Sequence, residues 1–193
     1  FRATNSATQK SCALKILHAH FGDREEFLHL FSKEAKVSSV IGESAHIVNV
    51  FDAGLDEELG IPFIVMELLE GETLERVLER GPLSPRLARQ LLVQLADALE
   101  QAHAAGVVHR DLKPSNLFVT TDKAGEPLLK VMDFGIAKVL EGEAVRTATH
   151  IGTPAYNAPE QMGSSTRKLA DKVGITIASG VSPATDVWAL GLI

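Results

Sequence analysis

The sequence predicts an α+β fold in which β-strands dominate the first third of the chain and helices dominate the remainder. Short apolar runs near residues 11–17, 47–51 and 61–66 are bounded by polar, acidic or glycine residues, which is typical of strands joined by turns. A later run, which begins at Pro85, repeats leucine at intervals of three and four residues, as an amphipathic helix does. Strands followed by helices along one chain indicate an α+β layout in two lobes.

One helix is expected among these early strands. Asp23 is a suitable N-cap, and Glu26 stands three residues later as its capping-box partner. The apolar residues that follow have helical spacing, so the helix is expected to continue to about Val40.

The longest predicted helix has signals at both ends. Ser84 is a good N-cap, Pro85 suits the first helical position, and Gly106 suits the position just beyond the last turn. Its apolar face is expected to consist of Leu87, Leu91, Leu92, Leu95, Leu99 and Ala102.

The elements beyond this helix are shorter. Residues 117–120 and 128–132 are expected to pair as a hairpin, and residues 142–152 are expected to form a polar loop. Residues 163–180 are rich in Gly, Ser and Lys, so a loop of unassigned role is expected there. Ser182-Pro183 repeats the N-cap and first-turn pattern and opens a final helix.

Composition limits the classes of function. The 193 residues carry a formal net charge of −6, which argues against a nucleic-acid binder because such proteins usually present a basic face. Cys12 is the only cysteine, which fits a reducing compartment such as the cytoplasm or the cytoplasmic face of a membrane. No run reaches the roughly 18 apolar residues of a membrane span. The chain opens at Phe1 without a methionine, so we expect a fragment, and any membrane anchor of the full-length protein stays open.

Three motifs occur in order in the second half of the chain. His109-Arg110-Asp111-Leu112-Lys113-Pro114-Ser115-Asn116 follows the long helix, Asp133-Phe134-Gly135 follows the hairpin, and Ala158-Pro159-Glu160 lies beyond the polar loop. Their order and spacing resemble the signature of the protein kinase family, in particular the bacterial Ser/Thr kinases related to the eukaryotic ones. The resemblance extends from Ala13 to Trp188.

The resemblance implies a two-lobed kinase fold that is truncated at both ends. Residues 1–66 would form the small β-rich lobe, with the family's Gly-rich loop lying before residue 1. Residues 67–193 would form the mainly helical large lobe, which ends within the helix that carries Asp186. The implied activity is transfer of the γ-phosphate of ATP to Ser or Thr hydroxyls of proteins, with Mg²⁺, or Mn²⁺ in its place, as the metal.

By resemblance, four residues would bind and transfer the phosphate. Asp111 would orient the attacking hydroxyl and accept its proton, and Lys113 would lie near the transferred phosphate. Lys15 would contact the α- and β-phosphates while paired with Glu34. Positive charge is needed there because negative charge spreads over the transferred oxygens.

The resemblance also implies a metal site and an adenine site. Asn116 and Asp133 match the family's metal ligands, and Mg²⁺ prefers oxygen donors from few protein groups. Asp133 would thus serve the bound nucleotide as well as the metal. The implied adenine contacts are Ala13, Leu117 and the backbone of Glu67 and Leu69.

Regulation and support are implied for the remaining motif residues. Arg110 would pair with a phosphate on Thr147 or Thr149, which would order the loop that contains them. Thr153 would contact the catalytic base at the substrate site. Structural roles are implied for His109, Phe134, Glu160 and Asp186.

Simpler explanations and other functions remain open. Taken singly, Lys15 fits an edge residue with its amine in water, Thr147 and Thr149 fit loop residues, and Trp188 fits a packing residue. A pseudokinase or scaffold that binds nucleotide without transfer is the main alternative, although the residues for transfer are present. A small-molecule phosphotransferase is disfavoured, because residues 152–160 resemble the segment that shapes a peptide site.

Overall fold

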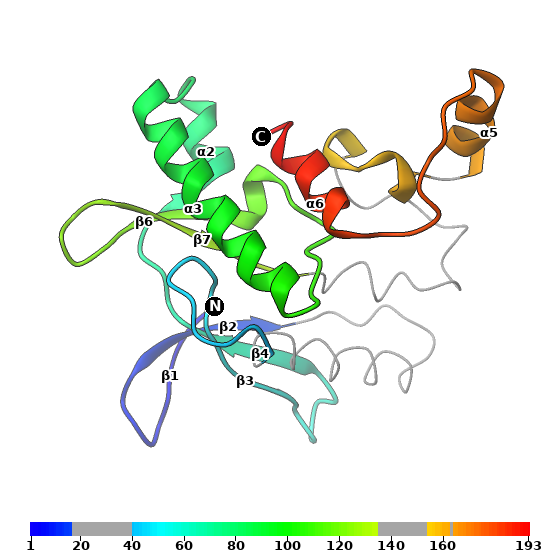
Figure 1. The fold of residues 1–193 in the computed structure, drawn as a ribbon. Coiled ribbons are helices and arrows are strands. Elements are labelled where there is room, and N and C mark those ends of the chain that lie inside the picture. Colours follow the sequence, from blue (N-terminus) through cyan, green and yellow to red (C-terminus); the bar gives the residue numbers. More distant parts are fainter. Residues whose placement is uncertain (17–39, 135–153, 163) are drawn as a thin grey trace.

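The computed structural model describes residues 1–16, 40–134, 154–162 and 164–193 (Figure 1). An antiparallel sheet of four strands is built from the N-terminal third of the chain and lies at the bottom of the view. Its strand order is β1-β2-β4-β3. The strands are β1 (Arg2–Thr4), β2 (Ser11–Ile16), β3 (Val50–Leu55) and β4 (Pro62–Met66).

The remaining described elements lie above that sheet in Figure 1 and are mainly helical. A second antiparallel sheet has the order β5-β6-β7, with β5 (Glu72–Thr73), β6 (Leu117–Thr121) and β7 (Pro127–Val131). The α-helices are α2 (Leu74–Glu79), α3 (Pro85–Ala104), α5 (Ser164–Lys172) and α6 (Pro183–Leu190). Three 3₁₀ turns are η1 (Pro114–Asn116), η3 (Pro154–Tyr156) and η4 (Pro159–Gln161).

Helix α3 confirms the strongest sequence prediction. The Ser84 hydroxyl accepts the Leu87 N–H at 3.3 Å, and Gly106 has a φ of 76°, the left-handed conformation that glycine adopts without strain. Leu92 is less buried than predicted, because it lies at the edge of the apolar face, where 42% of it is exposed. The buried face of α3 consists of Leu91, Leu95, Ala98, Leu99 and Ala102.

The predicted hairpin is also confirmed, and α3 holds it in place. The Asp122 carboxylate accepts the N–H groups of Ala124 and Glu126 and so closes the turn between β6 and β7. On the other side of β7, the Gln94 amide accepts the Leu129 N–H at 2.7 Å and donates to the Pro127 oxygen at 3.0 Å. The side chain therefore imitates a neighbouring strand, which satisfies backbone groups of β7.

The strand predicted at residues 47–51 is wrong in position. Ile47 and Val48 are buried against β7 instead, where the Val48 N–H donates to the Val131 oxygen at 3.0 Å. The true strand, β3, begins at Val50, and its register with β4 shifts just after it. The prediction fails because Ile47 and Val48 are buried by packing against the second sheet and are not part of a strand of the first sheet.

Other predictions fail or fall outside the described residues. Helix α5 occupies part of the segment at 163–180 for which a loop was expected. Trp188 is 46% exposed rather than buried in the core. The predicted helix that ends at about Val40 and the loop at 142–152 lie almost entirely outside the described residues. No helix in the described part of the chain is long and apolar enough to cross a membrane.

Candidate active site

The loop at residues 109–116 is fixed by a buried carboxylate from α6. Asp186 is only 1% exposed, and its two oxygens accept the N–H groups of His109 at 2.8 Å and Arg110 at 2.9 Å. The His103 ring of α3 contacts the same carboxylate at 2.8 Å. Two helices far apart in sequence thus hold the beginning of this loop.

The His109 ring connects the loop to the segment after β7. It is completely buried, its Nε2 lies 2.9 Å from the Met132 oxygen, and its Nδ1 lies 3.3 Å from the Asp111 nitrogen. A carbonyl only accepts and a backbone N–H only donates, so the ring is neutral with its proton on Nε2. Burial lowers the pKa of His109 from its ordinary value and keeps it in that form. The buried Phe134 ring packs beside it, with ring centroids 4.8 Å apart.

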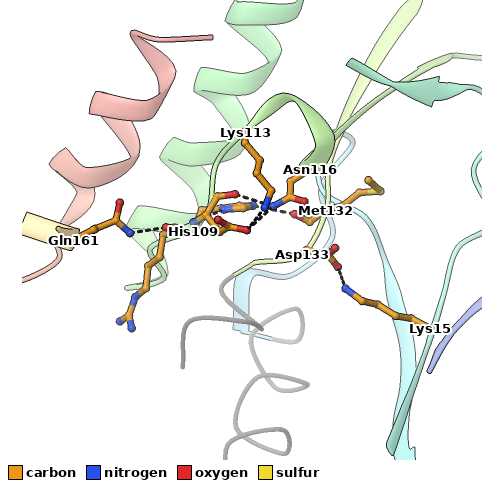
Figure 2. Close-up of polar contacts among 9 residues, drawn as sticks. Lys15, His109, Lys113, Asn116, Met132, Asp133 and Gln161 are labelled. Atoms are coloured by element: carbon orange, nitrogen blue, oxygen red, sulfur yellow. Dashed lines mark hydrogen bonds and ion pairs between the residues drawn. The ribbon is translucent and has the colours of Figure 1, made fainter. Parts of the chain in front are cut away.

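Asp111 is held by two side chains of the same loop, Lys113 and Asn116, which are labelled in Figure 2. The Asn116 amide donates to the Asp111 backbone oxygen at 2.7 Å and to its Oδ2 at 3.0 Å, and Lys113 Nζ lies 3.0 Å from Oδ2. The carboxylate is therefore oriented by a hydrogen bond and neutralised in part by an ammonium group. Because the Asn116 nitrogen faces Asp111, its amide oxygen is the atom left for another partner.

A second charged pair lies beside the first. Lys15 Nζ of β2 forms an ion pair with Asp133 Oδ1 at 2.5 Å, and both side chains are about one-third exposed. Figure 2 shows the two side chains pointing toward each other from opposite parts of the fold. Arg110 and Asp133 both have positive φ, 68° and 57°, which non-glycine residues rarely adopt. Such backbone strain tends to be kept where a site needs its side chains in a set position.

Comparison with known proteins accounts for this arrangement. The family model described as "Protein kinase domain" matches residues 1–193. The chain belongs to the protein kinase family. The predicted membership is therefore confirmed, and the two sheets and helices described above are the part of the kinase fold that the chain contains.

The similar proteins are bacterial Ser/Thr kinases. The kinase is 38% identical to Serine/threonine-protein kinase Pkn1 of Myxococcus xanthus, over 94% of this chain and 24% of Pkn1. It is 36% identical to PknA of Mycobacterium tuberculosis, over 100% of this chain and 42% of PknA. A crystal structure of the Mycobacterium tuberculosis PknI kinase domain shares 27% identity and a TM-score of 0.68, covering 99% of this chain and 64% of that one. The chain thus spans less than half the length of the two curated relatives.

Membership of the family implies ATP and a divalent metal, and the described donors fit both. No group of three His, Cys, Asp or Glu side chains that could cage a metal occurs among the residues that the structure describes. That is compatible with Mg²⁺, which usually takes one or two protein donors and leaves other positions to phosphates and water. The Asp133 carboxylate and the Asn116 amide oxygen are donors of this kind.

The segment after β4 contains an ion pair that sequence reasoning missed. Lys130 of β7 is buried, and its Nζ lies 2.7 Å from Glu67 Oε1 and 3.3 Å from the Ile47 oxygen. Glu67 Oε1 also accepts the Asn49 N–H at 2.7 Å, and the Glu67 N–H donates to the Asn49 oxygen at 2.9 Å. The signal in the sequence was a lone lysine within the apolar run at 128–132.

The predicted adenine contacts are placed unequally. Ala13 pairs with Met66 in the sheet and so lies next to Glu67. Leu117, however, is completely buried and lines a small apolar cavity between α2, α3 and β7. Its side chain therefore belongs to the core below β6. Because side chains alternate along a strand, Phe118 faces the other way, and its ring lies close to Gly71.

Several predicted residues are not brought together here. Glu34, Thr147, Thr149 and Thr153 lie outside the described residues. Glu160 is described, and its Oε1 accepts the Thr185 hydroxyl at 2.5 Å. The Arg110 guanidinium forms no ion pair with any residue in the described ranges.

Proposed function

We propose that this chain is the catalytic part of a Ser/Thr protein kinase that transfers the γ-phosphate of ATP to Ser or Thr hydroxyls of other proteins. The observation that carries the proposal is the convergence of two charged pairs from different parts of the fold. Lys15 meets Asp133 at 2.5 Å, and Asp111 is held at 3.0 Å by both Asn116 and Lys113. A pseudokinase would have no need to keep all of these groups in register.

Each group has a role that follows from its surroundings. Bound ATP supplies the phosphoryl group, and the metal that the family uses supplies charge that neutralises its oxygens. Asp111 would orient the attacking hydroxyl and take its proton, because its carboxylate is fixed by Asn116. Lys113 and Lys15 would bind phosphate oxygens, and Asp133 and Asn116 would hold the metal.

The adenine ring would bind beside the segment after β4. The backbone oxygen of Glu67 and the backbone N–H of Leu69 have no hydrogen bond to any described residue, so both are available for the adenine edge. Ala13 would cover one face of the ring. Phe118, rather than Leu117, would cover the other, since Leu117 points into the core.

Regulation, lobe division and location belong to the same proposal. Arg110 would pair with a phosphate on Thr147 or Thr149, because its guanidinium has no acidic partner among the described residues. Thr153 would contact the base, and Glu34 would pair with Lys15.

The small lobe would be residues 1–66 and the large lobe residues 67–193. The kinase would act in the cytoplasm or at the cytoplasmic face of a membrane, where ATP and reduced cysteine coexist.

The test is transfer by the full-length protein. The protein is incubated with labelled ATP and Mg²⁺ beside two variants, Asp111→Asn and the exposed helix control Asp97→Asn, and the labelled sites are mapped. We expect label on Ser or Thr with the wild type and Asp97→Asn, and a loss of at least about 100-fold with Asp111→Asn. ATP binding without label in any sample would favour the pseudokinase, and label on a small acceptor alone would favour the phosphotransferase.

A further inference from the structure

The peptide groups on either side of Arg110 are each tied to a different segment of the kinase. The N–H of Arg110 donates to Asp186 Oδ1 at 2.9 Å. The C=O of Arg110 accepts Gln161 Nε2 at 2.6 Å. Between these two ties the residue has a φ of 68°. Because the second peptide group leads directly into Asp111, its orientation also sets that of the Asp111 backbone.

Both the oxygen and the nitrogen of the Gln161 side-chain amide are hydrogen-bonded. Its Oε1 accepts the Ala158 N–H at 3.0 Å, while its Nε2 donates to the Arg110 oxygen. Both partners have a fixed role, since an N–H only donates and a C=O only accepts. The amide can therefore sit in one orientation only, and it joins the 158–160 segment to the 109–116 loop.

The same segment is anchored to α6 by a separate contact. Glu160 Oε1 accepts the Thr185 hydroxyl at 2.5 Å, and Thr185 precedes the Asp186 that holds Arg110. The segment at 158–161, the start of α6 and the 109–116 loop thus form one connected junction. A displacement of the 158–161 segment would pull on the Arg110 oxygen directly through Gln161.

We propose that Gln161 is a positioning residue that sets the orientation of Asp111 by holding the Arg110 carbonyl, and so couples the 158–160 segment to the transfer step. Gln161 touches neither Lys15 nor Asp133, so it acts on turnover rather than on nucleotide binding. The inference deepens the proposed kinase function and rests on it.

Two variants of the full-length protein separate this role from a general structural one. Gln161→Glu keeps the volume and the acceptor for Ala158 but replaces the donor with a carboxylate oxygen that faces the Arg110 oxygen. Gln161→Met keeps the volume and removes both hydrogen bonds. Gln101→Glu, an exposed position on α3, is the matched control for the change of charge.

We expect kcat to fall by about 10- to 100-fold in both Gln161 variants, because a catalytic group displaced by about 1 Å loses activity of this order. KM for ATP should stay within about twofold of wild type. Protonation of the carboxylate introduced by Gln161→Glu restores an O–H donor, so the activity of that variant relative to wild type should rise as the pH falls toward about 5. Gln161→Met should show no such recovery. Unchanged kcat in Gln161→Glu, or a loss that is independent of pH and equal in both variants, would overturn the inference.

A second readout separates this inference from the proposed function. Amide hydrogen exchange at residues 109–112 should accelerate in both Gln161 variants and not in Gln101→Glu, whereas β6 should stay protected. If the wild type transfers no phosphate, the proposed function fails, and exchange alone then judges Gln161. Unaltered exchange at 109–112 would show that Gln161 does not hold the loop.

Discussion

The buried ion pair between Lys130 and Glu67 offers a sharp test of what holds the two sheets together. Lys130 joins β7 to the segment after β4, and its side chain is 8% exposed, against 21% for Glu67. Lys130→Met keeps the volume of the side chain and leaves the Glu67 carboxylate with one of its two donors, the Asn49 N–H. The change therefore strands a largely buried negative charge.

The expected cost follows from that burial. Removing one partner of a buried pair costs about 3–5 kcal/mol, and the partial exposure of Glu67 together with its remaining hydrogen bond lowers this to about 2–4 kcal/mol. For a chain of this length the midpoint of thermal unfolding should fall by roughly 10 °C. Adding Glu67→Gln should restore about 1–2 kcal/mol, because the stranded charge is then gone.

The assay is urea-induced unfolding of the wild type, both single variants and the double variant, followed by circular dichroism. Lys123→Met, in the exposed turn between β6 and β7, is the matched control and should change stability by less than about 0.5 kcal/mol. If Lys130→Met equals this control, or if the double variant is no more stable than Lys130→Met, the pair does not stabilise the fold as argued.

Three further predictions concern single positions. The free energy of unfolding should fall by up to about 1.4 kcal/mol per pH unit below pH 6.5, because His109 binds a proton in the unfolded chain but stays neutral when it is buried in the fold. His109→Gln should remove this contribution to the pH dependence, measured by urea titrations. Gly71→Ala should lower the free energy of unfolding by at least about 2 kcal/mol more than Gly81→Ala does. A Cβ at Gly71 would lie 2.2 Å from a backbone oxygen of β6, whereas a Cβ at Gly81 would have no atom within 4 Å. Leu117→Ala should cost about 2–5 kcal/mol with KM for ATP unchanged, whereas Phe118→Ala should raise that KM about 10-fold.

The outcomes that contradict these predictions are distinct. An unchanged pH slope in His109→Gln would remove the buried neutral ring as its source. Equal stability of the two alanine variants at the glycines would show that β6 moves aside freely. A raised KM for ATP in Leu117→Ala, with Phe118→Ala unaffected, would return Leu117 to the adenine site.

Local signals in the sequence determined helix α3 and the β6–β7 hairpin. Ser84, Pro85 and Gly106 act through backbone geometry within a few residues, so their effect can be recognised without knowing the rest of the fold. The order and spacing of the motifs around Asp111 and Asp133 likewise sufficed to predict the family, because together they form the signature by which protein kinases are recognised.

Tertiary packing decided what the local pattern could not. The apolar run at residues 47–51 gave the wrong strand, since Ile47 and Val48 are buried by β7, which follows about 80 residues later. Helix α5 was not predicted, because the Gly-, Ser- and Lys-rich composition of residues 163–180 indicated a loop.

The same distinction between local sequence and tertiary structure applies to the candidate active site. The sequence determined which charged residues are available, but a side chain's partner depends on where distant segments meet. That Lys15 pairs with Asp133, Lys130 with Glu67 and Gln161 with the Arg110 oxygen follows only from the folded chain. Gln161 carried no signal of its own, because an amide gains its role from two backbone groups whose positions the tertiary structure alone sets.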